Sequence, residues 1–159
     1  MRKVLALLAA LVVGGGITVA VTASQAGASS EFTVVAHGTN AEFVTATGGS
    51  LVPKGPLVPG DRLILRADLL QNGAVVGSTE VVCTVMFNSD LLCDGMDTIT
   101  NRGDLHVTTL MRGAVGPGGI PKVFDIVVDG GTFAFNNAHG SGHVVVQPNG
   151  DEVTTYMLG

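Results

Sequence analysis

Residues 61–112 read DRLILRADLLQNGAVVGSTEVVCTVMFNSDLLCDGMDTITNRGDLHVTTLMR. Apolar and polar side chains alternate through this stretch, and the pairs Asn72-Gly73 and Arg102-Gly103 interrupt the alternation. A period of two is typical of half-buried β-strands, and pairs of the Asn-Gly kind accept the positive φ that a two-residue hairpin turn needs. Residues 61–112 therefore predict consecutive antiparallel strands joined by hairpins.

The alternation of apolar and polar residues continues on both sides of this stretch. After the N-terminal segment, no run of apolar residues with the 3.6-residue period of a helix is long enough to predict one. The expected strands cover residues 31–36, 42–47, 61–70, 74–87, 91–100, 104–112, 122–129, 142–147 and 151–158. Asn149-Gly150 marks another hairpin, and Asp94-Gly95 marks a bulge or a short turn. The proline-containing stretches 48–60 and 113–121 predict long connections, because proline cannot donate to a strand ladder.

These features predict an all-β fold. The number and length of the strands fit an eight-stranded antiparallel β-barrel, wide enough for side chains or one small ligand. Composition alone leaves a sandwich of two packed sheets as the alternative.

The N-terminal segment has the pattern of a secretory signal peptide. Arg2 and Lys3 precede an apolar run from residue 4 to about residue 23, and small residues follow. Cleavage after Ala26 or Ala28 fits this pattern equally well. An uncleaved membrane anchor is the rival interpretation, because the run approaches the ~20 residues that span a bilayer. We expect a signal peptide over residues 1–28, a single domain over residues 29–159, and a secreted protein with no integral membrane anchor after cleavage.

Export determines how the two cysteines, Cys83 and Cys93, are interpreted. In an oxidising compartment a close pair forms a disulfide. Both lie near the ends of strand-like segments on either side of residues 88–90, so a bridge across the hairpin is geometrically reasonable. The alternative is a catalytic thiol.

The overall charge bears on the class of partner. The chain has eight basic and thirteen acidic side chains, a net charge of −5; loss of Arg2 and Lys3 leaves six basic ones and about −7. Binding to nucleic acid normally needs a footprint of Lys and Arg on phosphates, so no nucleic-acid partner is expected. The same balance disfavours anionic membrane surfaces.

Two groups of residues resemble the allene oxide cyclase and dirigent superfamily. In the first half these are Gly60-Asp61, Asp68-Leu69-Leu70, Gly73 and Val76-Gly77. In the second half, residues 124–140 read FDIVVDGGTFAFNNAHG, which resembles the group's hydrophobic strand running into Gly-Gly-Thr-Gly, an aromatic residue and Asn-Ala-Arg-Gly. The matches span about residues 60–146. The resemblance implies a barrel that binds a small hydrophobic molecule, needs no cofactor, and forms a homodimer or homotrimer.

The glycines of the second motif also have a role that is independent of the family. Gly130 and Gly131 are able to take positive φ and turn the chain sharply, with the hydroxyl of Thr132 capping the turn. Three positions depart from the group. Phe133 replaces the third glycine, Ala134 occupies an often acidic position, and His139 replaces the arginine of the dirigent site, which puts the plant chemistry in doubt.

The candidate catalytic residues are Asp68, His139 and Arg66. Asp68 matches the acidic residue of the first dirigent motif, and a buried carboxyl with a raised pKa is a general acid. Its structural alternative is a solvent-facing carboxylate paired with Arg66. His139 replaces the missing arginine as a proton donor, and its structural alternative is an exposed loop residue.

Other histidines are weaker candidates. His139 and His143 would stand ~13 Å apart on one strand, so no metal site is expected. His106 shares a strand face with Asp104 and Thr108, and we expect that face on the outer surface. The resulting functional hypothesis is a cofactor-independent cyclase, isomerase or stereochemistry-directing protein, and the alternative is a non-catalytic apolar-ligand carrier or an exported structural protein.

Overall fold

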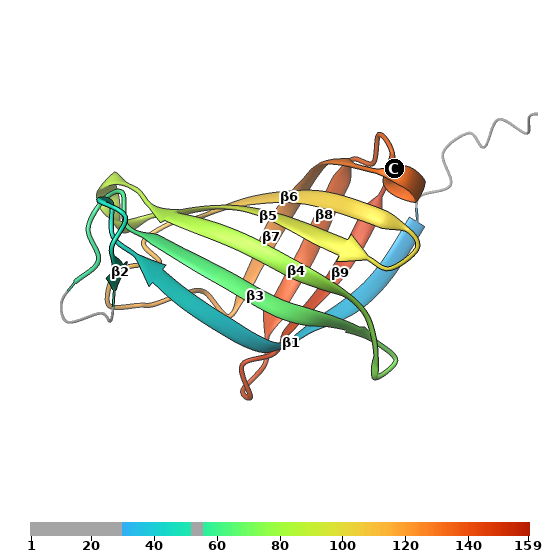
Figure 1. Ribbon diagram of the computed structural model, residues 1–159, viewed down its shortest axis with the longest axis horizontal. Helices are drawn as coiled ribbons and strands as arrows, with labels where there is room; N and C mark the ends of the chain where they lie inside the picture. The colour runs from blue at the N-terminus through green and yellow to red at the C-terminus, as the bar shows by residue number, and fades with distance from the viewer. Residues whose placement is uncertain (1–29, 52–55) are drawn as a thin grey trace, which may run out of the picture.

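The computed structural model describes residues 30–51 and 56–159, and the expected signal peptide over residues 1–28 lies outside them. Eight long antiparallel strands form a closed barrel, as the sequence predicts (Figure 1). The elements are β1 (Ser30–Val44), β2 (Ser50–Leu51), β3 (Arg62–Gln71), β4 (Ala74–Val85), η1 (Phe87–Ser89), β5 (Leu91–Ile99), β6 (Gly103–Met111), β7 (Val123–Gly131), η2 (Phe133–Phe135), β8 (Gly140–Val146) and β9 (Glu152–Leu158).

Each long strand pairs with its neighbour in the sequence, and β1 also pairs with β9 over Ser30 to Ala36, which closes the barrel. The two-residue strand β2 pairs only with the end of β1. Closure gives the edge strands partners and so removes open edges from the wall. Within the described ranges, no helix is long and apolar enough to cross a membrane.

The hairpin turns form where the Asn-Gly pairs predict them. Asn72 and Gly73 take φ values of 52° and 78°, and Gly150 takes 91°. The prediction of a bulge or turn at Asp94-Gly95 is wrong, because Gly95 lies inside β5, opposite Val81 and Val107. A Cβ at Gly95 would lie 2.7 Å from Cγ2 of Val81, so glycine provides space inside the barrel there.

β1 differs from the expected pair of strands 31–36 and 42–47, because it is one strand with a bulge between His37 and Asn40. Gly38 in the bulge has a φ of 69°. Pairing with β3 resumes at Asn40, so the polar interruption bends the strand without ending it.

The Gly130-Gly131 corner is built differently from the prediction. Both glycines belong to the end of β7, and neither has positive φ. Gly131 is required by close approach, since a Cβ would lie 2.6 Å from the carbonyl oxygens of Asp104 and Phe135. The prediction that the hydroxyl of Thr132 caps the turn is wrong, because the hydroxyl makes no cap hydrogen bond to η2 and instead accepts from the Asp104 amide on the neighbouring strand β6 at 3.0 Å. The positive φ, 50°, falls on Phe133.

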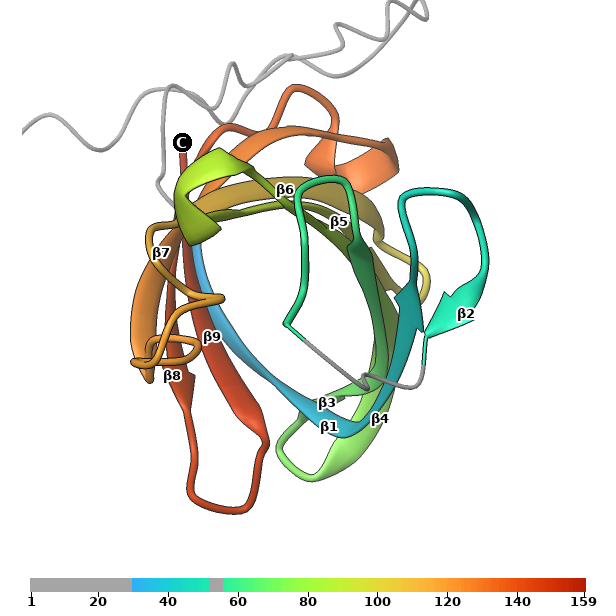
Figure 2. The same cartoon turned by 90° about the vertical axis from the view of Figure 1, so that its left-hand side faces the viewer.

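Inward-facing side chains form two apolar clusters at the two ends of the barrel. The cluster at the η2 end contains Val34, Ala36, Ala67, Leu69, Ile99, Leu105, Val107, Ile126, Val128, Phe135, Val144, Tyr156 and Leu158. The cluster at the η1 end contains Leu63, Cys83, Val85, Leu91, Cys93, Met111 and Ala114. Figure 2 views the barrel from the η1 end. Polar side chains lie inside the barrel between the two clusters.

Candidate functional site

The interior of the barrel contains a cavity of about 90 Å³, counted as the space that the centre of a water molecule can occupy. One water needs about 10–15 Å³ of such space, so the cavity holds several waters or a small ligand. Its walls are mainly aliphatic, as in most ligand sites. The lining includes Leu63, Leu65, Ala67, Thr79, Val81, Cys83, Cys93, Asp97, Val107, Thr109, Met111, Ile120, Phe124, Ile126, Val144, Glu152, Thr154 and Tyr156.

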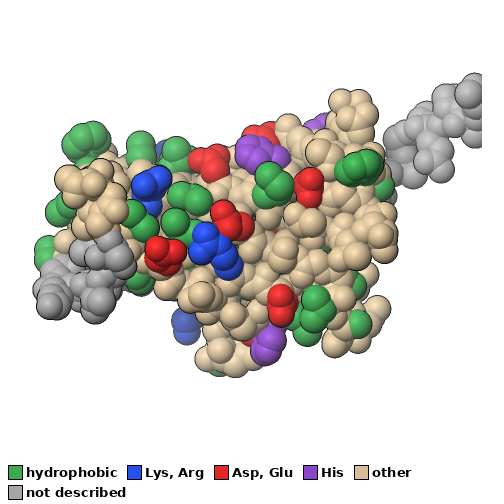
Figure 3. All heavy atoms as spheres, viewed as in Figure 1, with side chains coloured by type: hydrophobic (Ala, Val, Ile, Leu, Met, Phe, Trp, Pro, Cys, Tyr) green, Lys and Arg blue, Asp and Glu red, His purple; other side chains and the backbone are tan. Residues whose placement is uncertain are grey.

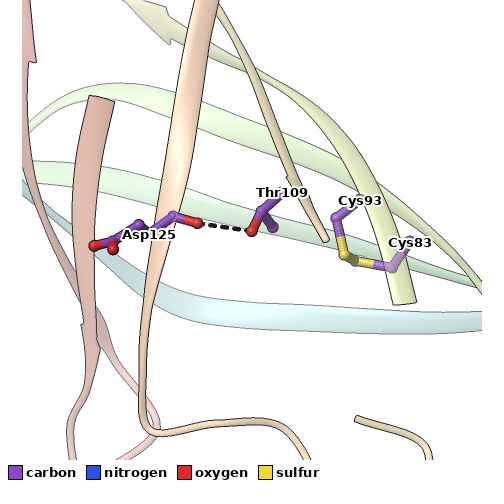
Figure 4. The surroundings of a disulfide bond; sticks show 4 residues. All are labelled: Cys83, Cys93, Thr109 and Asp125. Carbon is purple, nitrogen blue, oxygen red and sulfur yellow. Dashed lines mark hydrogen bonds between the residues drawn. A yellow bond between two sulfur atoms is a disulfide. The ribbon is translucent and has the colours of Figure 1, made fainter. Parts of the chain in front are cut away.

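The two cysteines form the predicted disulfide in this wall. Cys83 on β4 lies directly opposite Cys93 on β5, and the two sulfurs are 2.03 Å apart (Figure 4). Thr109, the neighbour of Cys93 on β6, donates its hydroxyl to the carbonyl of Asp125 at 2.7 Å. Both cysteines of the chain are used, so the alternative of a catalytic thiol is wrong.

Asp97 is the most enclosed carboxylate of the cavity, with 5 % of its surface exposed. It points inward from β5, where its strand partner on β4 is Thr79. The hydroxyl groups of Tyr156 and Thr79 both hydrogen-bond to it. Burial raises the pKa of Asp97, and the two hydrogen bonds oppose that rise. Asp97 therefore holds its proton at a higher pH than an ordinary aspartate does.

Tyr156 is held by an aromatic stack at the η2 end. Its ring centroid lies 4.9 Å from that of Phe32, which lies 5.9 Å from that of Phe135. The guanidinium of Arg102 covers the two phenylalanine rings at 5.1 and 4.7 Å. Burial, followed by the nearby charge of Asp97, raises the pKa of Tyr156 far above its usual value. The phenol thus stays a donor, and the stack aims it at Asp97.

Glu152 is the second acidic group of the cavity. It lies at the start of β9, two residues before Thr154 on the same inward face. Burial, and then repulsion from Asp97, raise the pKa of Glu152. Two carboxyl groups and one phenol therefore share an otherwise aliphatic space, and environments of this kind tune acids for proton transfer.

The structure does not bring Asp68 and Arg66 together inside the barrel. Asp68 is exposed on the outer face of β3, whose apolar residues alternate with it. The predicted ion pair of Asp68 with Arg66 is wrong, because the guanidinium binds Glu80 at 2.7 Å and Glu42 at 3.6 Å. Arg66 is nevertheless among the residues that line the cavity, and Arg66 and Asp68 together line a more open hollow that also includes Glu80. A catalytic role for these two residues stays a prediction.

His139 lies on the exposed connection between η2 and β8, where its Nδ1 is 3.1 Å from the carbonyl oxygen of Asn137. Its catalytic role also stays a prediction. His106 lies on the outer wall, as expected, with Nδ1 2.5 Å from Oδ1 of Asp129. Across residues 30–51 and 56–159, no three His, Cys, Asp or Glu side chains are grouped as metal ligands would be.

Sequence reasoning missed Asp97, although a signal was present. Asp97 alternates in phase with Leu91, Cys93 and Ile99, so it lies on the apolar face of its strand. Asp68, by contrast, alternates in phase with Arg66. An acid on an apolar strand face is the stronger indication of a buried functional group.

Comparison with known proteins shows likeness in structure only. No protein-family model matches the sequence, and no curated protein matches it. Among solved structures, a pyocyanin demethylase superposes with a TM-score of 0.61 and 18% identity, covering 82% of this chain and 100% of its own. A nonspecific heme-binding cyclase of neoabyssomicin biosynthesis superposes with a TM-score of 0.55 and 14% identity, covering 83% and 67%.

Two further structures have the same barrel. The Diels Alderase AbmU from Streptomyces koyangensis has a TM-score of 0.56 and 14% identity, covering 82% of this chain and 63% of its own. A pterocarpan synthase dirigent protein has a TM-score of 0.50 and 16% identity, covering 84% and 86%. The closed eight-stranded architecture and these superpositions show that the chain has the barrel fold that these four structures share, a dirigent protein among them.

Proposed function

We propose that the barrel binds a small apolar molecule and promotes its cyclisation or isomerisation, or directs the stereochemistry of its reaction. The observation that carries this proposal is Asp97, a carboxyl group buried in a largely aliphatic cavity with a raised pKa. Such a group is costly to bury unless it is paired, and acids of raised pKa are typical of proton-transfer sites.

The chemistry we propose needs one proton and no net change of atoms. Protonated Asp97 lends its proton to an oxygen or an alkene carbon of the substrate, and the carbon bonded to the protonated atom becomes electron-poor. A bond within the substrate then forms at that centre, and loss of a proton to the Asp97 carboxylate completes the isomerisation. Glu152 holds the polar end of the substrate by a hydrogen bond, and the phenol of Tyr156 remains protonated and keeps its hydrogen bond to Asp97 throughout.

The walls supply the second part of the effect. Aliphatic side chains of β3, β6 and β8 restrict the conformations of the bound molecule, and holding a reactive geometry lowers the barrier by reducing the entropy lost in the reaction. Gly95 leaves space beside Val81 and Val107 that a side chain would fill.

The second candidate is a non-catalytic carrier of an apolar ligand. It is favoured by the hydrogen bonds of Asp97, which Thr79 and Tyr156 satisfy from within the protein. In a carrier, this network serves the architecture of the barrel, and the ligand leaves unchanged.

Organic extraction of the purified protein, followed by mass spectrometry, tests binding first. A small apolar molecule should accompany the wild type and the Val127→Phe control, which changes the outer wall, but not Val107→Phe, which fills the cavity. Equal recovery from both variants would refute binding in this cavity.

Chemistry is tested with that molecule or its precursor. In an enzyme, Asp97→Asn should reduce turnover by a factor of about 100 or more while binding persists, since acid catalysis contributes about 10²–10⁴. In a carrier, wild type and variant bind alike and neither changes the ligand.

Secretion and self-association also remain proposals. The disulfide supports an oxidising compartment for the folded chain. A homodimer or homotrimer is expected from the resemblance, and light scattering of the purified protein tests it.

A further inference from the structure

The polar part of the cavity lining is small and has a distinct composition. It consists of five threonines, one arginine, one tyrosine and the two acids Asp97 and Glu152, and the rest of the lining is apolar. The hydrogen-bonding groups that the protein itself leaves unpaired determine what the polar end of a ligand must offer.

Most hydrogen-bond donors of this polar lining are already used. The hydroxyl groups of Thr79 and Tyr156 bind Asp97. Thr109 donates to the backbone of β7 at 2.7 Å, and Thr108 donates to a carboxylate on the outer wall at 3.3 Å. Few hydroxyl hydrogens are therefore left to bind an acceptor on a ligand.

Acceptors, by contrast, are in excess. An ionised carboxyl group offers about four lone-pair positions, and Asp97 receives two donors from the protein. Glu152 receives none, because its side chain forms no hydrogen bond and no salt bridge within residues 30–51 and 56–159. A ligand that fits this lining brings donors.

The charged groups that face the cavity have one sign. Arg66 is the only basic residue of the described ranges in the lining, and its guanidinium binds Glu80 at 2.7 Å and Glu42 at 3.6 Å on the outer wall. No histidine of those ranges lines the cavity. The other cations of the described ranges, which are also outside the lining, are Arg62, Arg102, Arg112 and Lys122.

We propose that the ligand of this cavity carries a protonated amine at one end of an apolar body, with its ammonium group bound to the Glu152 carboxylate. An ammonium supplies several N–H donors, no acceptor and a positive charge. A carboxylate or a phosphate would meet two acids with no cation to pair with, and a ketone or an ether would add acceptors to a lining that already has an excess.

An ammonium also offsets the cost of the buried acid. Burial, and then repulsion from Asp97, raise the pKa of Glu152, because its charge has no partner in the empty cavity. A buried charge becomes favourable when it is paired and hydrogen-bonded. The aliphatic walls bind the apolar body of the same molecule.

This inference rests on the proposed function, because it places the ligand in the same cavity. It gives the two acids different tasks. Glu152 binds the ammonium in its ionised form, while Asp97 keeps its hydrogen bonds to Thr79 and Tyr156 and retains the proton that the isomerisation needs. Two carboxyl groups of one site take separate roles in this way when their environments differ.

Three probes with the same hydrocarbon chain test the assignment: hexylammonium, 1-hexanol and hexanoate. At neutral pH they present a cation, a neutral hydroxyl and an anion. Isothermal titration calorimetry of the purified full chain measures the affinity for each. Hexylammonium should bind about tenfold or more tightly than 1-hexanol, because a hydrogen bond between charged groups corresponds to at least that factor. Hexanoate should bind more weakly than both.

A matched pair of variants separates the cavity from the outer surface, where acidic side chains also lie (Figure 3). Glu152→Gln should weaken the binding of hexylammonium by about tenfold or more and leave that of 1-hexanol nearly unchanged. Glu31→Gln removes the same charge from an exposed position on β1 and should change neither affinity. Equal losses in the two variants would show that the amine follows the overall negative charge, and would overturn the assignment.

The cavity-filling variant Val107→Phe distinguishes failure of this inference from failure of the proposed function. If it abolishes binding of 1-hexanol, and the wild type shows no preference for hexylammonium, the amine assignment is overturned and the cavity remains a binding site. If no probe binds to the wild type, or if Val107→Phe leaves all binding unchanged, the proposed cavity site is overturned and the amine assignment with it.

Discussion

Tyr156 on β9 donates its hydroxyl hydrogen to the Asp97 carboxylate on β5, four strands away around an eight-stranded barrel. The bond therefore crosses the interior and joins opposite walls. Tyr156 belongs to the apolar cluster at the η2 end, so the bond brings a polar pair to the edge of that cluster. Because both groups are buried, their states of protonation affect stability as well as chemistry.

Asp97→Asn should change how stability depends on pH. The pKa of Asp97 is raised above its usual 3.8 in the folded protein, so folded protein binds more protons than unfolded protein between 3.8 and the raised pKa. The free energy of unfolding of the wild type therefore falls as pH rises through that window. Asn does not titrate, so the free energy of unfolding of Asp97→Asn should rise relative to that of the wild type across the same window. The change should be about 1.4 kcal/mol for each unit by which folding raises the pKa of Asp97. Urea titrations at a series of pH values measure it. A constant difference would contradict the raised pKa.

Tyr156→Phe should destabilise the folded protein by about 1–3 kcal/mol, because Asp97 loses one of its two donors while staying buried. Urea unfolding at neutral pH measures the loss. The control is the same substitution in Asp97→Asn, where an amide replaces the carboxyl acceptor and the loss should be smaller. If the two losses were equal, the hydrogen bond would contribute nothing specific.

Removing the disulfide should cost about 2–3 kcal/mol, since it closes a loop with a sequence separation of 10. The double variant Cys83→Ala, Cys93→Ala should unfold at a lower temperature than the oxidised wild type. A reductant should lower the wild-type midpoint and leave that of the variant unchanged. Sensitivity of the variant to reductant would point to another cause.

Phe133→Gly should stabilise the protein by up to about 1 kcal/mol. Phe133 takes a φ of 50°, and this left-handed conformation costs a residue with a Cβ about 1–2 kcal/mol. Glycine removes that cost, but part of the stabilisation is lost because glycine has more conformational freedom in the unfolded chain. Phe133→Ala is the control, because it removes the exposed ring and keeps the Cβ. Chemical denaturation should rank glycine above alanine, and the reverse order would show that the conformation is not strained.

Much of the wall of the barrel could be predicted from local sequence. Alternation located the eight long strands, and Asn72-Gly73 turned the chain as expected, because a hairpin turn depends on its own residues. The bulge in β1 was missed, since pairing with β3 continues through a polar stretch that reads as a break. Gly95 was misread as a turn because the crowding it relieves comes from side chains on two neighbouring strands.

By itself, the sequence determined the strands, their order, the cysteine pair and the negative net charge, because these follow from neighbouring residues or from simple counts. Only the tertiary structure decided that Asp97 meets Tyr156, 59 positions away, while Asp68 faces solvent. The physical reason is closure: which face of each strand turns inward, and which ends meet, depends on the packing of all eight strands at once.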